Sequence, residues 1–151
     1  MLEIALVDAT LLPFFHPRGI AVIGASHDPI KLGFGVARNL TQSGYPGAIH
    51  LVNPRGGALM GHPVHRDVAS VPDPVDLAVI VVPAAAVPSA VQACGARGIH
   101  AAIIASGGFR EVGAEGAALE AQVAELARSL GVRLVGPNCI GLLDTHLPLD
   151  T

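Results

Sequence analysis

Several residue types are scarce in this chain of 151 residues, and each scarcity excludes a class of protein. Aromatic residues make up 3% of the sequence and tryptophan is absent, which argues against a surface that stacks on nucleic-acid bases. Charged residues make up 14%, well below the share of about a quarter that is usual in soluble domains. Because the net charge is only −3, no broad electrostatic attraction to nucleic acid or to an anionic membrane is expected.

Cysteines and long apolar runs are equally limited. Two cysteines, Cys94 and Cys139, are too few for a disulfide scaffold. No apolar run approaches the roughly 20 residues that span a bilayer, and the N-terminus lacks the basic and apolar segments of a signal peptide. We therefore expect a cytoplasmic protein with reduced thiols and with neither a nucleic-acid nor a membrane partner.

Hydrophobic residues make up 51% of the chain, and their runs alternate with helical patterns. The apolar runs predict buried strands at residues 19–23, 48–52, 77–82, 101–105 and 132–135. The helical spacing predicts helices at residues 35–42, 86–97 and 114–130. This alternation predicts the α/β class: a Rossmann-like doubly wound parallel sheet of about five strands in a single domain.

The segments outside these elements are expected to be less regular. Residues 11–17 are interpreted as a lead-in whose aromatic side chains pack against the sheet edge. Residues 54–74 are mostly turn residues, with one short helix expected near 66–70.

The end of the chain is expected to have little structure of its own beyond residue 142. The whole chain is interpreted as one ligand-binding domain with its core at residues 11–144. Residues 145–151 are interpreted as the start of a linker to a further domain that this sequence does not contain.

Each predicted strand ends in a turn of small or polar residues. The five turns comprise residues 24–33, 53–57, 83–85, 106–109 and 136–141. Ligands of open parallel sheets bind beyond the carboxyl ends of the strands, so these turns are expected to form one site. Glycines let backbone N–H groups approach phosphate oxygens, and a helix that starts near Gly33 adds its positive dipole end. The pattern predicts a phosphate-bearing nucleotide ligand.

The turn after the second strand narrows the choice of nucleotide. An NAD-binding fold normally carries an acidic residue there for the ribose hydroxyls, whereas this chain has Arg55. A guanidinium suits an additional ribose phosphate, so coenzyme A and NADP are both candidates. The loop at 24–33 departs from the G-x-G-x-x-G spacing, and its Gly24 and Gly33 have tight strand–helix packing as an alternative role.

For other side chains the sequence gives weaker support for a function. Lys31, the only lysine, is placed to neutralise a phosphate, and a solvated side chain is the less favoured alternative for both Lys31 and Arg55. His62 and His65 have only Asp67 as a nearby additional ligand, so no metal site is predicted. Cys139 is expected to line the pocket rather than to act as a nucleophile. No catalytic residue is predicted.

Five blocks of the sequence resemble the N-terminal CoA-binding domain of NDP-forming acyl-CoA synthetases. The blocks are residues 17–26, 31–33, 52–57, 72–84 and 136–141, and they occur in the family's order. The family includes ADP-forming acetyl-CoA synthetase and, more distantly, the alpha subunit of succinyl-CoA synthetase. The resemblance covers the chain from about residue 12 to residue 144.

The resemblance implies that coenzyme A or acyl-CoA lies across the strand ends. Ser26 and the neighbouring backbone would then hold CoA phosphates, and Lys31 and Arg55 would contact phosphate or ribose. Many relatives carry lysine at position 55, so arginine keeps the charge. The implied CoA-binding residues are Gly24, Ala25, Ser26, Lys31, Gly33, Asn53, Pro54, Arg55, Val82, Pro83, Ala84, Ser106, Gly107, Gly108, Phe109, Pro137, Asn138 and Cys139. Of these, Pro137, Asn138 and Cys139 would lie near the thiol end.

The resemblance also implies a longer parent protein. The family interconverts acyl-CoA, ADP and phosphate with acid, CoA and ATP through a phosphohistidine in a following domain, and an ATP-grasp module handles the nucleotide. None of the seven histidines here matches that phosphohistidine. The isolated chain is therefore expected to bind CoA without turnover, with downstream ligase and ATP-grasp domains or subunits as partners. The alternatives are a stand-alone CoA-binding regulator, the CoA-binding part of a GNAT-fused protein acetyltransferase, and an NADP-dependent oxidoreductase domain.

Overall fold

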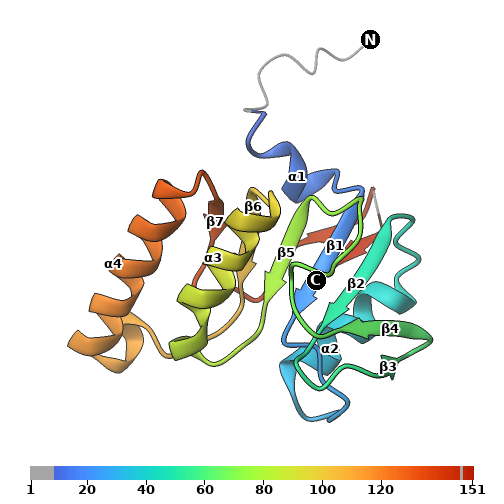
Figure 1. Ribbon diagram of the computed structural model, residues 1–151, viewed down its shortest axis with the longest axis horizontal. Coiled ribbons are helices and arrows are strands. Elements are labelled where there is room, and N and C mark those ends of the chain that lie inside the picture. The colour runs from blue at the N-terminus through green and yellow to red at the C-terminus, as the bar shows by residue number, and fades with distance from the viewer. Residues whose placement is uncertain (1–8, 147) are drawn as a thin grey trace.

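The computed structural model describes residues 9–146 and 148–151, so the N-terminal segment considered above for signal-peptide features lies largely outside the described residues. Its main sheet has helices on both faces (Figure 1). The strands of this sheet are β1 (Gly19–Ile23), β2 (Ala48–Val52), β3 (Ala58–Leu59), β4 (His62–His65), β5 (Leu77–Ile80), β6 (Ala101–Ile104) and β7 (Arg133–Val135). The α-helices are α1 (Leu12–Phe15), α2 (Leu32–Gln42), α3 (Val87–Arg97) and α4 (Ala114–Ser129), and two 3-10 helices are η1 (Ala84–Ala86) and η2 (Arg110–Val112).

The strand order in the sheet is β3-β4-β2-β1-β5-β6-β7. Every neighbouring pair is parallel except β3 and β4, which pair antiparallel. From β1 the chain passes first to β2 on one side and later to β5 on the other, so the strand order reverses beside β1. The predicted α/β class and the mostly parallel sheet of a single domain are confirmed.

The sheet has seven strands rather than about five, because residues 54–74 contribute β3 and β4. Strand β4 has one buried apolar side chain, Val64, so no apolar run marks it in the sequence. It is held by its parallel pairing with β2. The short helix expected near residues 66–70 is wrong. There the Asp67 carboxylate accepts the N–H of Ser70 at 2.8 Å, a local bond that competes with helix formation.

The end of the chain also has more structure than expected. Strands β8 (Leu143–Asp144) and β9 (Leu149–Asp150) pair antiparallel. The side chain of Leu149 is fully buried in the core layer that includes α2. The N–H of Leu142 donates to the hydroxyl of Thr151 at 2.8 Å, which closes this hairpin.

Two core layers sandwich the sheet. Helices α3 and α4 cover one face, and α2 with α1 covers the other (Figure 1). Along β1, Ile20 and Val22 join the layer of α2, whereas Ala21 and Ile23 join the layer of α3 and α4. Burial on both faces explains why this strand is a continuous apolar run. In the lead-in, Phe14 is buried in the α2 layer, whereas Phe15 is exposed.

Helix α2 begins three residues earlier than the helical spacing at 35–42 predicts. Its N-cap is Lys31, whose backbone is extended (φ −81°, ψ 143°). Gly33 and Gly35 fall within the first helical turns, and glycine is a poor helix former, which hides this start in the sequence. The amino end of α2 therefore lies next to Lys31 at the carboxyl edge of the sheet.

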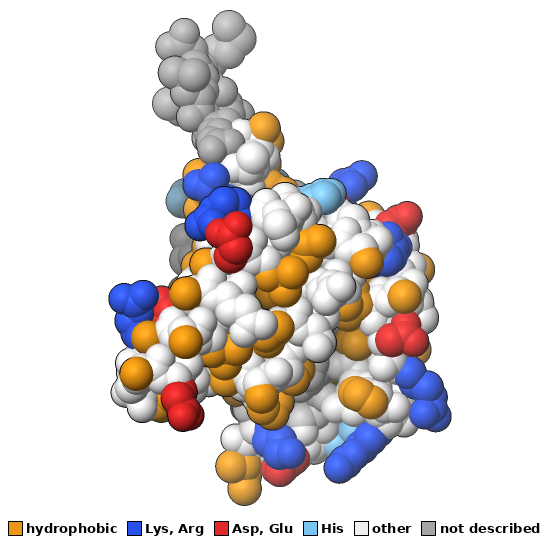
Figure 2. Space-filling model, turned by 60° about the vertical axis from the view of Figure 1, so that its left-hand side comes forward, with side chains coloured by type: hydrophobic (Ala, Val, Ile, Leu, Met, Phe, Trp, Pro, Cys, Tyr) orange, Lys and Arg blue, Asp and Glu red, His pale blue; other side chains and the backbone are white. Residues whose placement is uncertain are grey.

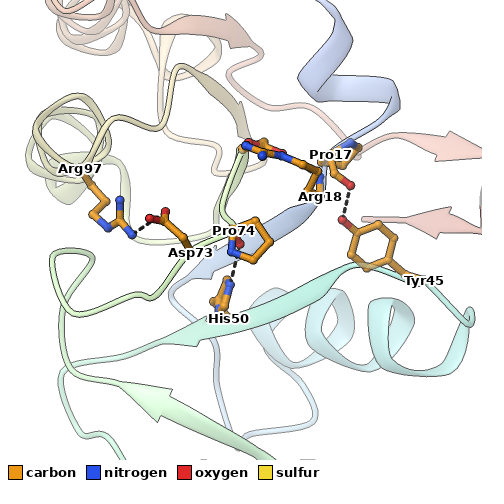
Figure 3. Close-up of polar contacts among 8 residues, drawn as sticks. Pro17, Arg18, Tyr45, His50, Asp73, Pro74 and Arg97 are labelled. Carbon is orange, nitrogen blue, oxygen red and sulfur yellow. Dashed lines mark hydrogen bonds and ion pairs between the residues drawn. The ribbon is translucent and has the colours of Figure 1, made fainter.

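Polar contacts secure the opposite, amino edge of the sheet (Figure 3). The hydroxyl of Tyr45 donates to the carbonyl of Pro17 at 2.6 Å, and burial raises the pKa of Tyr45 to about 12. The imidazole of His50 lies 2.9 Å from the carbonyl of Pro74. These contacts join the segments that lead into β1, β2 and β5. Hydrogen bonds within the chain therefore occupy polar groups at this edge.

An ion pair at the same edge gives the protein a pH-dependent contribution to stability. Arg18 donates to the Asp76 carboxylate through Nε at 2.9 Å and Nη2 at 2.7 Å, and these bonds lower the pKa of Asp76. A carboxyl group with a lowered folded-state pKa stabilises the fold above its unfolded pKa of about 4, and the effect is lost as the pH falls through the folded value. Asp76→Asn is therefore expected to cost about 1 kcal/mol near pH 7 and less near pH 2, where protonation of the carboxyl group weakens the ion pair.

Urea denaturation of the wild type and Asp76→Asn at both pH values checks this expectation. Asp73→Asn is the matched control, because the Asp73 side chain pairs with Arg97 but is 81% exposed. An equal loss at pH 7 and pH 2 would contradict the assignment to this ion pair.

The low charge content is visible on the surface. Figure 2 shows hydrophobic side chains between scattered charged ones on the side of the molecule where α4 lies. Exposed alanines of α4, among them Ala118 and Ala121, belong to this side. Within the residues that the structure describes, no helix combines the length and the hydropathy needed to cross a membrane.

Candidate functional site

A pocket of about 650 Å³ opens at the carboxyl edge of the sheet. It lies between the loops that follow β1, β2, β5 and β6, where the strand order reverses. Its lining residues are Gly24, Ser26, Lys31, Leu32, Gly33, Asn53, Pro54, Val81, Val82, Pro83, Ala86, Ala105, Ser106 and Gly107. Doubly wound sheets bind ligands in this crevice. Four of the five turns predicted to form a site contribute to this pocket, and the turn at residues 136–141 does not line it.

The loop after β1 forms one wall of the pocket. Gly24 has a positive φ of 100°, and its N–H donates to the carbonyl of Val52 at 2.9 Å. Gly33 approaches this loop so closely that a Cβ on it would lie 2.0 Å from the carbonyl oxygen of Gly24. Gly33 therefore permits tight strand–helix packing and also lines the pocket. The hydroxyl oxygen of Ser26 accepts the N–H of Asp28 at 3.1 Å, which leaves its proton available to a ligand.

The amino end of α2 opens onto the same pocket. Leu32 and Gly33, its first two residues, line the cavity, and no side chain caps the helix. Lys31 lies beside this end, is exposed and also lines the cavity. The N–H of Phe34 donates to the carbonyl of Lys31 at 3.0 Å, whereas the N–H groups of Leu32 and Gly33 have no intrahelical acceptor, so this end of α2 favours an anion.

Asn53 organises the turn after β2. Its backbone N–H donates to the carbonyl of His65 at 2.9 Å, and its side-chain amide donates to the carbonyl of Ala25 at 2.8 Å. Its Oδ1 accepts the N–H of Arg55 at 2.9 Å. Asn53 and Pro54 line the pocket, whereas the Arg55 side chain is exposed and lies outside the lining.

The loops after β5 and β6 form the opposite wall, which includes Val82, Pro83, Ser106 and Gly107. The buried hydroxyl of Ser106 donates to the carbonyl of Val82 at 2.5 Å and joins the two loops. The carbonyl of Ser106 accepts the N–H of Asn138 at 3.0 Å, which brings the turn after β7 next to the pocket. Asn138 itself does not line the cavity.

Six more of the predicted residues lie outside the pocket lining. Ala25 is buried in the core layer of α2. Ala84 begins η1 and Gly108 lies in the loop beyond Gly107. Phe109 is fully buried in the core layer of α3 and α4, because its large apolar ring is stabilised there. Pro137 lines a separate groove beside α4, and Cys139 is half-buried. The ligand contacts of all the candidate residues remain predictions.

Glu111 is a neighbour of the site that the sequence analysis missed. Its carboxylate accepts the N–H of Gly108 at 2.5 Å. Hydrogen bonds from the backbone N–H groups of Gly108, Glu111 and Phe109 lower the pKa of Glu111, so it stays ionised and holds the turn that carries Gly107. A carboxylate three residues after a Gly-Gly pair is the sequence feature that could have indicated it.

Four lining residues were also missed: Leu32, Val81, Ala86 and Ala105. The apolar runs predict strands that end at residues 82 and 105, whereas β5 ends at Ile80 and β6 ends one residue before Ala105. Residues expected in the buried strands therefore reach the pocket. Leu32 was placed in the preceding loop and Ala86 in the following helix.

The candidate ligands for a metal lie apart from the pocket lining. His62 and His65 are both on β4, and the ring of His65 lies 6.1 Å from that of His50. No group of three or more His, Cys, Asp or Glu side chains among residues 9–146 and 148–151 is placed to hold a metal ion. Cys94 is buried, and this burial raises its thiol pKa to about 12.

Similar proteins of known sequence identify the family of this chain. Residues 18–145 match the family described as the CoA binding domain. The chain is 43% identical over 136 residues to the ADP-forming acetate–CoA ligase I of Archaeoglobus fulgidus, covering 90% of this chain and 20% of that protein. It is 43% identical over 137 residues to the ADP-forming acetate–CoA ligase II subunit alpha of Pyrococcus furiosus, covering 91% of this chain and 30% of that subunit.

A solved structure shows the same similarity. The apo form of dinucleotide-forming acetyl-coenzyme A synthetase 1 from Ca. Korarchaeum cryptofilum is 40% identical, with a TM-score of 0.88 over 92% of this chain and 30% of that chain. This chain therefore belongs to the CoA-binding domain family, in the form found in ADP-forming acyl-CoA synthetases, and its ligand is coenzyme A. The family resemblance of the sequence is confirmed. The chain spans less than a third of each of these relatives.

Proposed function

We propose that this chain binds coenzyme A or acyl-CoA in the pocket at the carboxyl edge, as one domain of a longer ADP-forming acyl-CoA synthetase. The observation that carries the proposal is the uncapped amino end of α2, which opens into the pocket beside Lys31. The diphosphate of CoA carries negative charge, and helix N–H groups with a nearby ammonium stabilise such a group. The pocket therefore suits the phosphate-bearing part of CoA.

The rest of the ligand follows the two walls. The terminal ribose phosphate lies toward Arg55, where the turn after β2 leaves the guanidinium exposed. The adenine and pantetheine parts follow the wall formed by Val82, Pro83, Ser106 and Gly107. The thiol end lies toward Pro137–Cys139 in the turn after β7.

The whole parent protein interconverts acyl-CoA, ADP and phosphate with acid, CoA and ATP, as the names of the relatives support. The downstream ligase and ATP-grasp domains or subunits are its partners in the cytoplasm. The role of the present chain in that reaction is to hold CoA with its thiol presented to the acyl-transfer centre of those partners.

Calorimetric titration of the chain with CoA, NADP and NAD⁺ tests the proposed ligand. We expect saturable binding of CoA and no binding of the two nicotinamide dinucleotides. Binding of NADP alone would instead favour the oxidoreductase alternative. If none of the three binds, the proposal fails for the isolated chain, and the same titration of the longer protein would show whether a further domain completes the pocket.

A further inference from the structure

The cationic side chains of this protein differ in their partners. Four arginines each form an ion pair: Arg18 with Asp76, Arg97 with Asp73, Arg110 with Glu120 and Arg128 with Glu125. In the described part of the chain, Lys31, Arg38, Arg55 and Arg66 make no ion pair. Arg38 lies on α2 and bonds to Asn39. The other three residues follow β1, β2 and β4, which are neighbours in the sheet. Three of these four cations therefore follow strands that end at the carboxyl edge beside the pocket.

Arg66 lies directly against the turn that holds Arg55. Its Nη1 donates to the carbonyl of Pro54 at 3.3 Å, and Pro54 lines the pocket. A Cβ on Gly56 would lie 3.3 Å from both Cγ and Nε of Arg66, so the arginine stem packs along the turn. The parallel pairing of β4 with β2 brings the two arginines together, although they are eleven positions apart in the sequence.

Nearby carboxylates do not neutralise this pair of arginines. Asp67 follows Arg66 directly, but its Oδ1 accepts the N–H of Ser70 at 2.8 Å. Asp28 lies in the loop after β1, where its Oδ1 accepts the N–H of Ile30 at 3.1 Å. Both carboxylates are held by local backbone groups, and neither forms an ion pair with Arg55 or Arg66.

We propose that Arg66 binds the terminal ribose phosphate of CoA together with Arg55 and so determines the preference for ligands that carry this group. This inference rests on the proposed function. A phosphomonoester carries nearly two negative charges at neutral pH, which two guanidinium groups balance better than one. A guanidinium has five N–H donors, and only one of those of Arg66 is bonded to Pro54, so a bidentate pair remains for phosphate oxygens.

Calorimetric titration with CoA and with dephospho-CoA, which lacks only the terminal phosphate, tests this assignment. Arg66→Met keeps most of the stem that packs on Gly56 but removes the charge. It is expected to weaken CoA binding about tenfold and to leave dephospho-CoA binding unchanged. Arg66→Lys should restore much of the preference for CoA. Arg38→Met is the matched control, because Arg38 is exposed on α2, more than one helical turn from the pocket end.

The outcomes separate this assignment from the proposed function. If the wild type binds CoA and Arg66→Met binds it equally well, only the role of Arg66 is overturned. Equal losses for CoA and dephospho-CoA would also overturn that role, because they indicate a general distortion of the turn. A wild-type chain that binds neither ligand would overturn the proposed function of the isolated chain, and the role of Arg66 with it.

Discussion

Gly33→Ala is expected to destabilise the protein by about 3 kcal/mol and to abolish measurable CoA binding. The added methyl group would lie 2.0 Å from the carbonyl oxygen of Gly24 and 3.3 Å from a methyl group of Val81. The first of these contacts is with backbone, so it cannot be relieved by a side-chain rotation. The amino end of α2 would have to move away from β1, and the N–H groups that we propose to bind phosphate would move with it. Urea denaturation and CoA titration measure the two effects.

Gly35→Ala is the matched control in the same helix. A Cβ at position 35 meets no heavy atom within 4 Å, so the substitution should stabilise α2 by up to about 1 kcal/mol through helix propensity. Its CoA affinity should equal that of the wild type. If Gly33→Ala retained the wild-type unfolding midpoint, the close approach of α2 to β1 would tolerate a side chain at position 33. The explanation given for Gly33 would then be wrong.

Arg55→Glu is expected to weaken CoA binding by about tenfold or more, because it removes a charged donor and places a carboxylate beside the ligand phosphate. The side chain is exposed and outside the pocket lining, so the substitution should leave the unfolding midpoint nearly unchanged. The backbone N–H of Arg55, which donates to Asn53, is kept in the variant. Titration of both proteins with CoA measures the loss. The loss should shrink at high salt, since exposed charges are screened.

Arg38→Glu controls for the change in net charge. Arg38 is exposed on α2 and bonds only to Asn39, at 3.4 Å, among the described residues. We expect this variant to lose little CoA affinity compared with Arg55→Glu. Equal losses would mean that the overall charge of the molecule, and not a phosphate contact at position 55, governs binding.

The buried strands could be predicted because both of their faces are covered. Continuous apolar runs such as the one in β1 occur when helices pack on each side of a sheet, and here the predicted runs mark β1, β2, β5, β6 and the edge strand β7 to within two residues. Strands β3 and β4 could not be predicted in this way. They have few buried side chains, and β4 is held mainly by backbone pairing with β2.

The site could be predicted as a set of turns but not as a set of contacts. Glycine-rich turns after parallel strands indicate that a ligand binds at the carboxyl edge of the sheet. The pocket includes residues from four of the five turns. The side chains that support those turns were missed, because their partners depend on local backbone geometry. Glu111 reaches back to Gly108, and Arg66 crosses from β4 to Pro54. Phe109 shows the opposite error, since a residue of a predicted ligand turn is buried in the core.

The sequence by itself determined the α/β class, the family and the carboxyl edge as the place of the candidate site, because these follow from periodicity and from motifs that are local along the chain. Only the tertiary structure decided which cations lie at the same edge of the sheet. Lys31, Arg55 and Arg66 are separated in sequence, and the strands that they follow are neighbours in the order β4-β2-β1. That order depends on how the sheet buries its two faces, which is a property of the packed molecule and not of any one segment.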